Sequence, residues 1–511
     1  MPVQSALETS GPGCLFIAFA VAAVIYLARS CHRIQQLRDL EQLHGCKKPP
    51  NESDRFRYDF FGIAKAIELA FSFRTRTSLR YTNVLFQKYG ETYTSNVLGY
   101  RLLFTCSAEN TKHLLSTAFV DFDSSPLRKP LFKPITPQGI FTLDGADWKT
   151  SREQLRSRLS NLRKAIDLTL CEQHFQAFCQ HVPSNGQVFD IQSRFFALSL
   201  DIQTSFSLGE SVDALSLTQS LEKEQFLKHL LLVKERIVQD GFRGPLRHLS
   251  SKRKFLQSCK RAREYVVVRA IREIERRNNM EGKPGKKGAS KSDSSSVTDE
   301  ISQLTDQSLS ILLANDSMST TLSGLFFCLS QDARVVRKLR ASILDTIGLT
   351  PPTWEQLGRL HYIRWVLQEG TRSPLRLYPP VVLNARVANK NSTLPNGGGS
   401  DGNSPVLVMK GDIVVFSTWA RHRLGEDFGD KPETFYPERW EHLSGDMAGF
   451  IPFNKGPRIC PGQQYAMIVL TYVVARMFQT FSTVFNYNPG PWKERISMTF
   501  ENENGVLVGL S

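Results

Sequence analysis

The segment at residues 453–462, FNKGPRICPG, contains a thiol in a setting that favours its reactive form. Proline and glycine stand on both sides of Cys460, so the backbone there is a rigid turn that a planar group can approach closely. A helix is predicted to begin near Gln463 and would direct its N-terminal dipole at the sulfur. Together with the nearby cation Arg458, this dipole would lower the thiol pKa. A buried thiolate on such a loop meets the needs of an axial iron ligand.

The same segment resembles the haem-binding signature of the cytochrome P-450 family, Phe-x-x-Gly-x-Arg-x-Cys-x-Gly. All of its fixed positions are present, as Phe453, Gly456, Arg458, Cys460 and Gly462. The resemblance implies a mainly α-helical fold with small β-sheets and haem b as cofactor. It also implies that Cys460 is the metal ligand, that Arg458 pairs with a haem propionate and that Phe453 shields the sulfur.

Further haem contacts follow from the same resemblance. Trp148 and Arg152 match the family's Trp-x-x-x-Arg helix, and Arg386 matches a third propionate ligand. Residues four apart lie on one face of a helix, so Trp148 and Arg152 could share an anionic target.

A Glu-x-x-Arg pair, Glu369 and Arg372, resembles the family's buried ion pair, which Arg439 of the segment FYPERW would join. Here the sequence departs from the family pattern. Four residues, including Pro374, are inserted before Arg376, which instead precedes the Leu-Tyr-Pro sequence of the family. Whether Arg372 or Arg376 completes the pair stays open at this point.

Residues 313–319, LANDSMS, resemble the family's distal-helix stretch that relays protons to bound dioxygen. The resemblance places Asp316 at the acid position and Ser317 at the alcohol position, as the catalytic residues. Serine retains the hydroxyl of the usual threonine, while Ala314 replaces a glycine and Met318 a second threonine.

The composition of the chain argues against a nucleic acid partner and against a disulfide framework. The chain has 511 residues and a net charge of +15, yet no zinc-finger, helix-turn-helix or aromatic RNA-binding pattern accompanies the basic run at 243–263, so no nucleic acid partner is expected. The nine cysteines are dispersed without a C-x-x-C pair, which is typical of a reducing compartment rather than of a disulfide framework.

Residues 11–28 contain no charge and are followed by Arg29 and Arg33. Eighteen residues of helix span roughly 27 Å, enough to cross the hydrocarbon core, and positive charge after the span places the following chain in the cytosol. This pattern predicts a lumenal N-terminus at residues 1–10 and a single-pass anchor at 11–28 in the endoplasmic reticulum membrane. A polar stretch at 29–54 would follow, with a Pro-Pro hinge.

The monooxygenase domain is expected at residues 55–511. Alternating polar and apolar residues predict a hairpin at 91–105 and strands within 406–418. Residues 301–343 should form one or two long, buried helices, and a helix is predicted from about 463 to 480. The low-complexity segment at 281–297 predicts a flexible loop.

The resemblance implies a monooxygenase that inserts one atom of dioxygen into a C–H bond of a small lipophilic substrate. Several strings are similar to the fungal alkane- and fatty-acid-hydroxylating branch, while a secondary-metabolite intermediate remains an alternative substrate. Electrons would come from NADPH through a separate cytochrome reductase, with cytochrome b5 as a further candidate donor. Two rival hypotheses are a haem-thiolate isomerase or dehydratase that does not use dioxygen, and a degenerate, non-catalytic protein.

Overall fold

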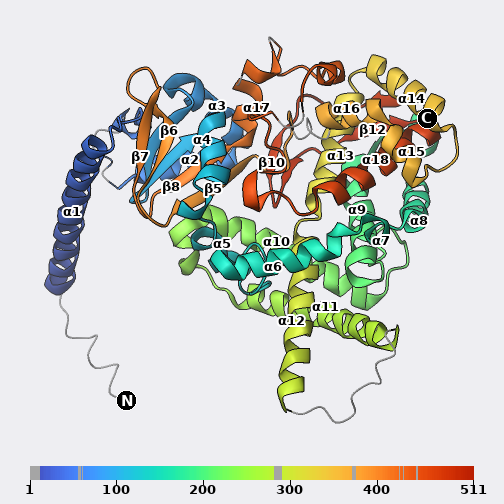
Figure 1. Cartoon of the computed structure of the whole chain (residues 1–511), viewed down its shortest axis with the longest axis horizontal. Coiled ribbons are helices and arrows are strands. Elements are labelled where there is room, and N and C mark those ends of the chain that lie inside the picture. The colour runs from blue at the N-terminus through green and yellow to red at the C-terminus, as the bar shows by residue number, and fades with distance from the viewer. Residues whose placement is uncertain are drawn as a thin grey trace.

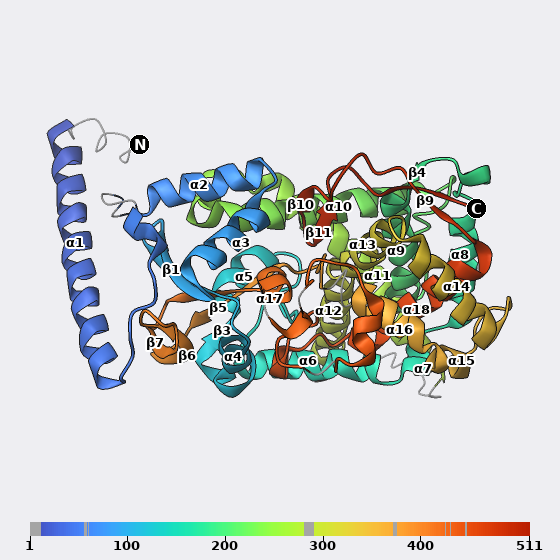
Figure 2. The same cartoon turned by 90° about the horizontal axis from the view of Figure 1, so that it is seen from above.

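The computed structural model describes residues 12–511 except 56–58, 60, 281–290, 371–375, 425, 430, 445 and 446. Helices dominate, as the sequence predicts. Most strands lie on one side of the body, and α8, α9, α14, α16 and α18 lie on the other side, where β12 is also found (Figure 1). The N-terminal helix α1 stands at the edge of the strand-rich side (Figure 2).

The longer helices, apart from α1, make up most of the body. Their bounds are α1 (Pro12–Leu43), α2 (Ile63–Arg74), α3 (Ser78–Tyr89), α5 (Ser125–Phe132), α6 (Gly145–Ser160), α8 (Leu168–Cys179), α9 (Ile191–Leu208), α10 (Leu221–Arg243), α11 (Arg253–Met280), α12 (Lys291–Leu313), α13 (Asp316–Leu329), α14 (Ala333–Ile347), α16 (His361–Gly370) and α18 (Gln463–Thr480). Shorter helices are α4 (Ala108–Lys112), α7 (Leu162–Ala165), α15 (Trp354–Arg359) and α17 (Thr418–Leu424).

The strands form four small sheets. The largest has the order β1-β2-β8-β5-β3, and the others pair β6 with β7, β10 with β11, and β12 with β4 and β9. The strands are β1 (Thr92–Val97), β2 (Tyr100–Thr105), β3 (Phe122–Asp123), β4 (Phe189–Asp190), β5 (Leu383–Ala388), β6 (Ser392–Gly398), β7 (Ser404–Val408), β8 (Ile413–Ser417), β9 (Val484–Asn486), β10 (Glu494–Ile496), β11 (Phe500–Asn502) and β12 (Leu507–Leu510). The predicted hairpin at 91–105 is confirmed as the antiparallel pair β1–β2, with Thr92 opposite Thr105.

The main core lies where α9, α13, α14, α16 and α18 pack together. Phe195 of α9, Phe326 of α13 and Phe478 of α18 form a continuous aromatic contact, with ring centroids 5.1 and 5.8 Å apart. These rings are buried. The core therefore fixes α13 against α18, the helix that follows Cys460.

Residues 301–343, predicted to form one or two long helices, belong to three: α12, α13 and α14. The prediction of a loop at 281–297 is wrong for residues 291–297, because α12 begins at Lys291. The last glycine of that segment is Gly288, so no helix breaker follows it. Residues 281–290 lie outside the described part of the chain.

The segment predicted as a polar stretch and hinge is ordered against the body. Helix α1 continues to Leu43, and Arg33 Nη2 lies 2.5 Å from the buried carboxylate of Asp412. Beyond α1, the Lys47 N–H donates to the Pro405 carbonyl at 2.9 Å. The structure thus holds in place a segment for which the sequence predicts a hinge.

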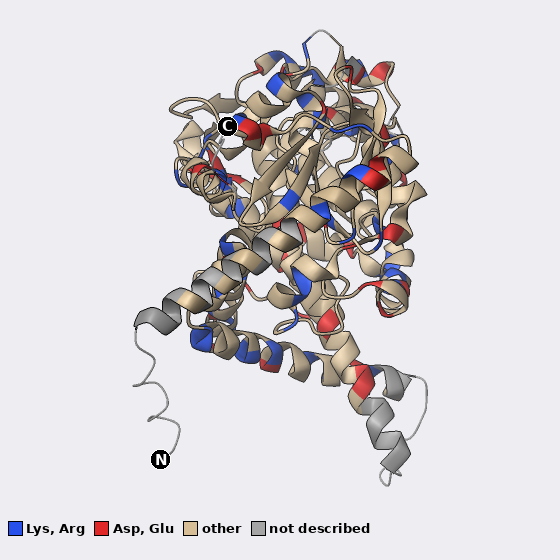
Figure 3. Ribbon diagram, turned by 90° about the vertical axis from the view of Figure 1, so that its left-hand side faces the viewer, with Lys and Arg blue, Asp and Glu red and all other residues tan. Residues whose placement is uncertain are grey.

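Figure 3 shows α1 projecting from the body near the N-terminus, with acidic and basic residues interspersed over the rest.

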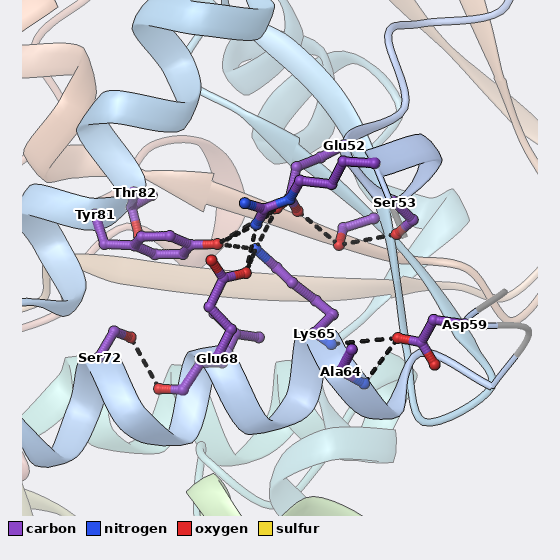
Figure 4. A network of polar contacts seen from close by, with 12 residues as sticks. Glu52, Ser53, Asp59, Ala64, Lys65, Glu68, Ser72, Tyr81 and Thr82 are labelled. Carbon is purple, nitrogen blue, oxygen red and sulfur yellow. Dashed lines mark hydrogen bonds and ion pairs between the residues drawn. The ribbon is translucent and has the colours of Figure 1, made fainter. Parts of the chain in front are cut away.

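A buried polar network secures the start of the body (Figure 4). The Glu52 carboxylate accepts hydrogen bonds from Lys65 Nζ at 2.7 Å and from the Ser95 hydroxyl at 3.0 Å. Asp59 accepts the backbone N–H groups of Ile63 and Ala64 at the first turn of α2. The network joins α2 and β1 to the short helix at Glu52–Arg55.

No helix in the described part of the chain combines the length and apolar character needed to cross a membrane.

Candidate haem-thiolate site

The loop before α18 holds Cys460 in a closed turn. The Cys460 N–H donates to the Phe453 carbonyl at 2.9 Å, and α18 begins at Gln463, where the sequence predicts it. Gly456 has φ +66°, and a Cβ there would lie 1.9 Å from the Leu115 carbonyl oxygen. Glycine is therefore required at this position, because any side chain would be strained and would collide with the backbone.

The electrostatics of the Cys460 sulfur differ from the expectation. Burial raises its pKa, whereas the Gly462 N–H and the charge of Arg152 lower it, and the pKa is raised on balance. The prediction of a lowered pKa is therefore wrong for the protein alone. The residue is nevertheless solvent-accessible.

Arg152, rather than Arg458, is the cation that acts on the sulfur. Arg152 Nη2 donates to the Ile459 carbonyl at 2.5 Å, and its guanidinium lies 5.6 Å from the centroid of the Trp148 ring. Arg458 lies over the same ring at 4.3 Å and forms an ion pair with Asp144. The structure thus brings Trp148, Arg152 and Arg458 together beside the loop, as the resemblance implies.

The guanidinium groups of Arg128, Arg386 and Arg458 lie close enough to act on one another. Burial and the charges of Arg128 and Arg458 lower the pKa of Arg386 to about 9. Burial, only partly offset by Asp144, lowers the pKa of Arg458 to about 10. The Nε atoms of both side chains are buried and have no hydrogen-bond partner among the described residues.

This excess of buried positive charge fits the carboxylates of a haem. Unpaired buried cations are costly, and two propionates would supply the missing charge and acceptors. Arg128 of α5 was not predicted from the sequence, because it stands in a helix with other exposed cations and only the fold shows that it faces Arg386.

Glu369 of α16 is at the centre of a buried ion network. Its Oε1 accepts from Arg376 Nη2 at 3.1 Å and from Arg439 Nε at 2.7 Å, and its Oε2 accepts from Trp440 Nε1 at 2.6 Å. Both Glu369 and Arg376 are fully buried. The pairing of Glu369 and Arg439 agrees with the prediction. Arg376 is bound to Glu369 despite the insertion, and Arg372 lies outside the described residues, so its predicted part in the network stays a prediction.

The candidate catalytic residues lie where the long helix breaks. Residues 314 and 315 separate α12 from α13, which begins at Asp316. Ala314 is exposed between buried Leu313 and Asn315, and Ser317 is half-buried. Ala314 is therefore accessible at the break between α12 and α13, where the resemblance places the helix that lies over the distal face of the haem.

Asp316 is not a free acid in this structure. Its Oδ1 lies 2.7 Å from Lys234 Nζ of α10, and both side chains are almost completely buried. The sequence shows no sign of this partner, since Lys234 lies 82 positions away on a helix rich in exposed charges.

Comparison with known proteins identifies the class. The family model for cytochrome P450 matches residues 61–503, and the chain belongs to this family of haem-thiolate monooxygenases. Among its relatives is the Cytochrome P450 monooxygenase fsdH of Fusarium heterosporum, 32% identical over 97% of this chain and 89% of that protein. Cytochrome P450 monooxygenase himC of Aspergillus japonicus is 34% identical over 97% and 88%. Cytochrome P450 52A13 of Debaryomyces hansenii is 30% identical over 97% and 96%. The resemblance to the cytochrome P-450 family that the sequence predicts is therefore confirmed.

Proposed function

We propose that the chain is a membrane-attached monooxygenase that inserts one oxygen atom of dioxygen into a C–H bond of a lipophilic substrate. The observation that carries this proposal is the Cys460 loop beside Arg386 and Arg458, two buried guanidiniums whose Nε atoms have no hydrogen-bond partner among the described residues. A thiol close to buried cations matches the two groups by which a protein holds a haem, its iron and its propionates.

In this proposal Cys460 ligates the iron, and Arg152, Arg386, Arg458 and Trp148 hold the propionates. Phe453 shields the sulfur, while Gly456 and Gly462 let the loop approach the porphyrin closely. When bound, a thiolate-ligated haem would supply the activation of dioxygen, because the thiolate pushes electron density toward the iron and favours cleavage of the O–O bond.

The chain's own residues control protons and water. Asp316 and Ser317 stand at the helix break, where a carboxylate and a hydroxyl can pass protons across a short distance. Asp316 is also in contact with Lys234 of α10 at 2.7 Å, so a relay through this carboxylate would include the ammonium group of Lys234.

Electrons come from NADPH through a separate cytochrome reductase, with cytochrome b5 as an additional donor. The sequence supports a separate partner because it contains no nicotinamide or flavin fingerprint.

The attachment to the endoplasmic reticulum membrane rests on residues 11–28, which lack charges, and on an apolar surface of the body. On α2, Ile63, Ile67 and Phe71 recur every four residues and are more than half exposed. Phe73 of the same helix contacts Phe242, with ring centroids 3.8 Å apart, which joins this surface to the exposed Leu246 and Leu249. Exposed apolar surface of this kind suits contact with lipid.

The substrate class rests on the strings of this sequence that resemble the fungal alkane- and fatty-acid-hydroxylating branch. A long-chain fatty acid or alkane is therefore the first candidate, and a secondary-metabolite intermediate is the second. The test is incubation of the haem-loaded protein with reductase, NADPH and a fatty-acid panel. Hydroxylated products support the first candidate, and their absence from fully loaded enzyme rejects it.

The degenerate, non-catalytic alternative loses its main support. It rests on the insertion after Glu369, yet Arg376 occupies the ion-pair position in spite of that insertion.

A further inference from the structure

Helix α1 is attached to the body through one of its faces. Arg33, Leu37 and Leu40 are spaced at i, i+4 and i+7, so they lie on the same side of the helix. Both leucines are partly buried and pack against a buried cluster that includes Leu407 of β7 and Met409. The last turns of α1 are therefore part of the hydrophobic packing of the body.

The Asp412 carboxylate adds a specific polar contact to this packing. Asp412 is fully buried, and its Oδ2 lies 2.6 Å from Arg101 Nη1 and accepts the Met409 N–H at 3.0 Å. Its Oδ1 lies 2.5 Å from Arg33 Nη2, which is the partner of that oxygen among the described residues. A buried carboxylate oxygen without a partner is costly, so the body itself requires the docking of α1.

The chain that follows α1 makes a second attachment, to the β6–β7 hairpin. The Lys47 N–H donates to the Pro405 carbonyl at 2.9 Å, and the Gly399 N–H donates to the Lys48 carbonyl at 3.0 Å. The approach is close, because a Cβ at Gly398 would lie 2.5 Å from the Lys47 carbonyl oxygen. Residues 33–48 are thus held both by a helix face and by backbone hydrogen bonds.

The attached part of α1 continues toward the N-terminus without a hinge. There is no glycine or proline between Cys14 and His44, and α1 is one helix from Pro12 to Leu43. The part that precedes Arg33 is roughly 30 Å long at 1.5 Å per residue. Figure 2 shows its N-terminal end on the same side of the molecule as α2 and α10, which carry exposed apolar residues.

We propose that residues 33–48 form a strut that holds the body at one orientation and one distance from the membrane, with the apolar surface of α2 against the lipid. This inference rests on the proposed membrane attachment. It replaces the hinge predicted within residues 29–54 by a rigid connection. A substrate dissolved in the lipid would then always meet the same side of the body.

The docking of the strut can be tested without a membrane. The detergent-solubilised, haem-loaded protein is treated with a lysine-specific protease, and cleavage after Lys47 is followed by mass spectrometry. The Lys47 side chain is exposed, but its backbone is bonded to the hairpin, so the wild type should resist cleavage. Arg33→Ala/Leu37→Ser removes the ion pair and an apolar contact, and this variant should be cleaved several-fold faster.

The matched control changes the opposite face of the same turns. Arg38→Ala/Ile34→Ser makes similar substitutions at two exposed positions of α1 and should leave the cleavage rate unchanged. Rapid cleavage of the wild type, or equal rates in the two variants, overturns the docking of the strut.

The orientation is tested in vesicles of phosphatidylcholine with brominated acyl chains, which quench a tryptophan that contacts the lipid. Phe71→Trp places a reporter at an exposed apolar position of α2, and the protein without this substitution supplies the background. Four alanines inserted after Ser30 lengthen α1 by about 6 Å. With a rigid strut the insertion moves the body away from the lipid, so quenching of the added tryptophan should fall several-fold.

The same insertion distinguishes a strut from a flexible tether. In the Arg33→Ala/Leu37→Ser background it should leave the quenching unchanged, because a loosened body can follow its apolar surface to the lipid. An insertion without effect in the chain with an intact strut overturns the proposal. If the added tryptophan is not quenched even without the insertion, the lipid contact of α2 is rejected and the proposed orientation with it, whereas the protease result still decides whether the strut is docked.

Discussion

The sulfur of Cys460 is subject to opposing influences, and the sequence reveals only some of them. The helix that begins at Gln463 and the Gly462 N–H were predictable from the proline and glycine pattern, and both act to stabilise the thiolate. Burial, which dominates, depends on how the whole chain packs around the loop. The protein alone therefore favours the thiol, and binding of iron is expected to release its proton.

At the residue scale, Gly456 offers a sharp prediction. Gly456→Ala should destabilise the protein by at least about 2 kcal/mol, because alanine at positive φ is strained and its Cβ would collide with the Leu115 carbonyl. Thermal unfolding and haem content are the measurements.

The matched control is Gly462→Ala, on the other side of Cys460. Its φ is negative and a Cβ there meets no protein atom within 4 Å, so in the thermal unfolding of the haem-free protein the substitution should cost less than about 1 kcal/mol. Equal losses in the two variants would contradict the assigned role of Gly456.

At the scale of elements, the ion network of α16 separates Arg376 from Arg372. Arg376→Ala should lower the free energy of unfolding by about 3–5 kcal/mol, because it leaves the fully buried Glu369 carboxylate short of one partner. Chemical denaturation followed by circular dichroism measures this loss. If Arg372→Ala causes the larger loss, the assignment of Arg376 is wrong.

The β10–β11 hairpin gives a pH-dependent prediction. Glu494 accepts the Leu79 N–H at 2.9 Å at the start of α3, and burial raises its pKa from 4.5 to about 6. The folded protein therefore binds this proton more tightly than the unfolded chain does. The stability that it contributes is present below pH 4.5 and is lost as the pH rises through 6.

A glutamine side chain cannot titrate, so the Glu494→Gln variant should lack this pH-dependent part of the free energy of unfolding. It amounts to about 1 kcal/mol after allowance for partial exposure. Denaturation midpoints of both proteins between pH 4.5 and 7 provide the comparison. Parallel pH profiles would show that Glu494 has an ordinary pKa.

The elements themselves were largely predictable. Alternation around Gly99 gave β1–β2, and the glycine and proline cluster before Gln463 located α18. The division of the long helix at Ala314 was not predictable, because no glycine or proline marks it, although Asn315, Asp316 and Ser317 are weak helix formers. Likewise, Lys234 and Arg128 reach the site only through tertiary contacts, and no local pattern distinguishes them from surface charges.

At the scale of the whole molecule, the proposed topology predicts a specific glycosylation pattern. Asn391 is exposed and begins the acceptor sequence Asn-Ser-Thr. If the body is cytosolic, Asn391 should stay unmodified in endoplasmic reticulum microsomes, whereas an acceptor on an N-terminal extension should be glycosylated. Gel mobility before and after deglycosylation measures both, and glycosylation at Asn391 would contradict the cytosolic orientation.

The central claim is that the Cys460 sulfur ligates haem iron as a thiolate. The most direct measurement is the carbon monoxide difference spectrum of the reduced, purified protein, wild type beside Cys460→His. The account predicts a strongly red-shifted Soret band in the wild type that Cys460→His abolishes. A wild type without that band despite bound haem, or a variant that retains it, would contradict the account.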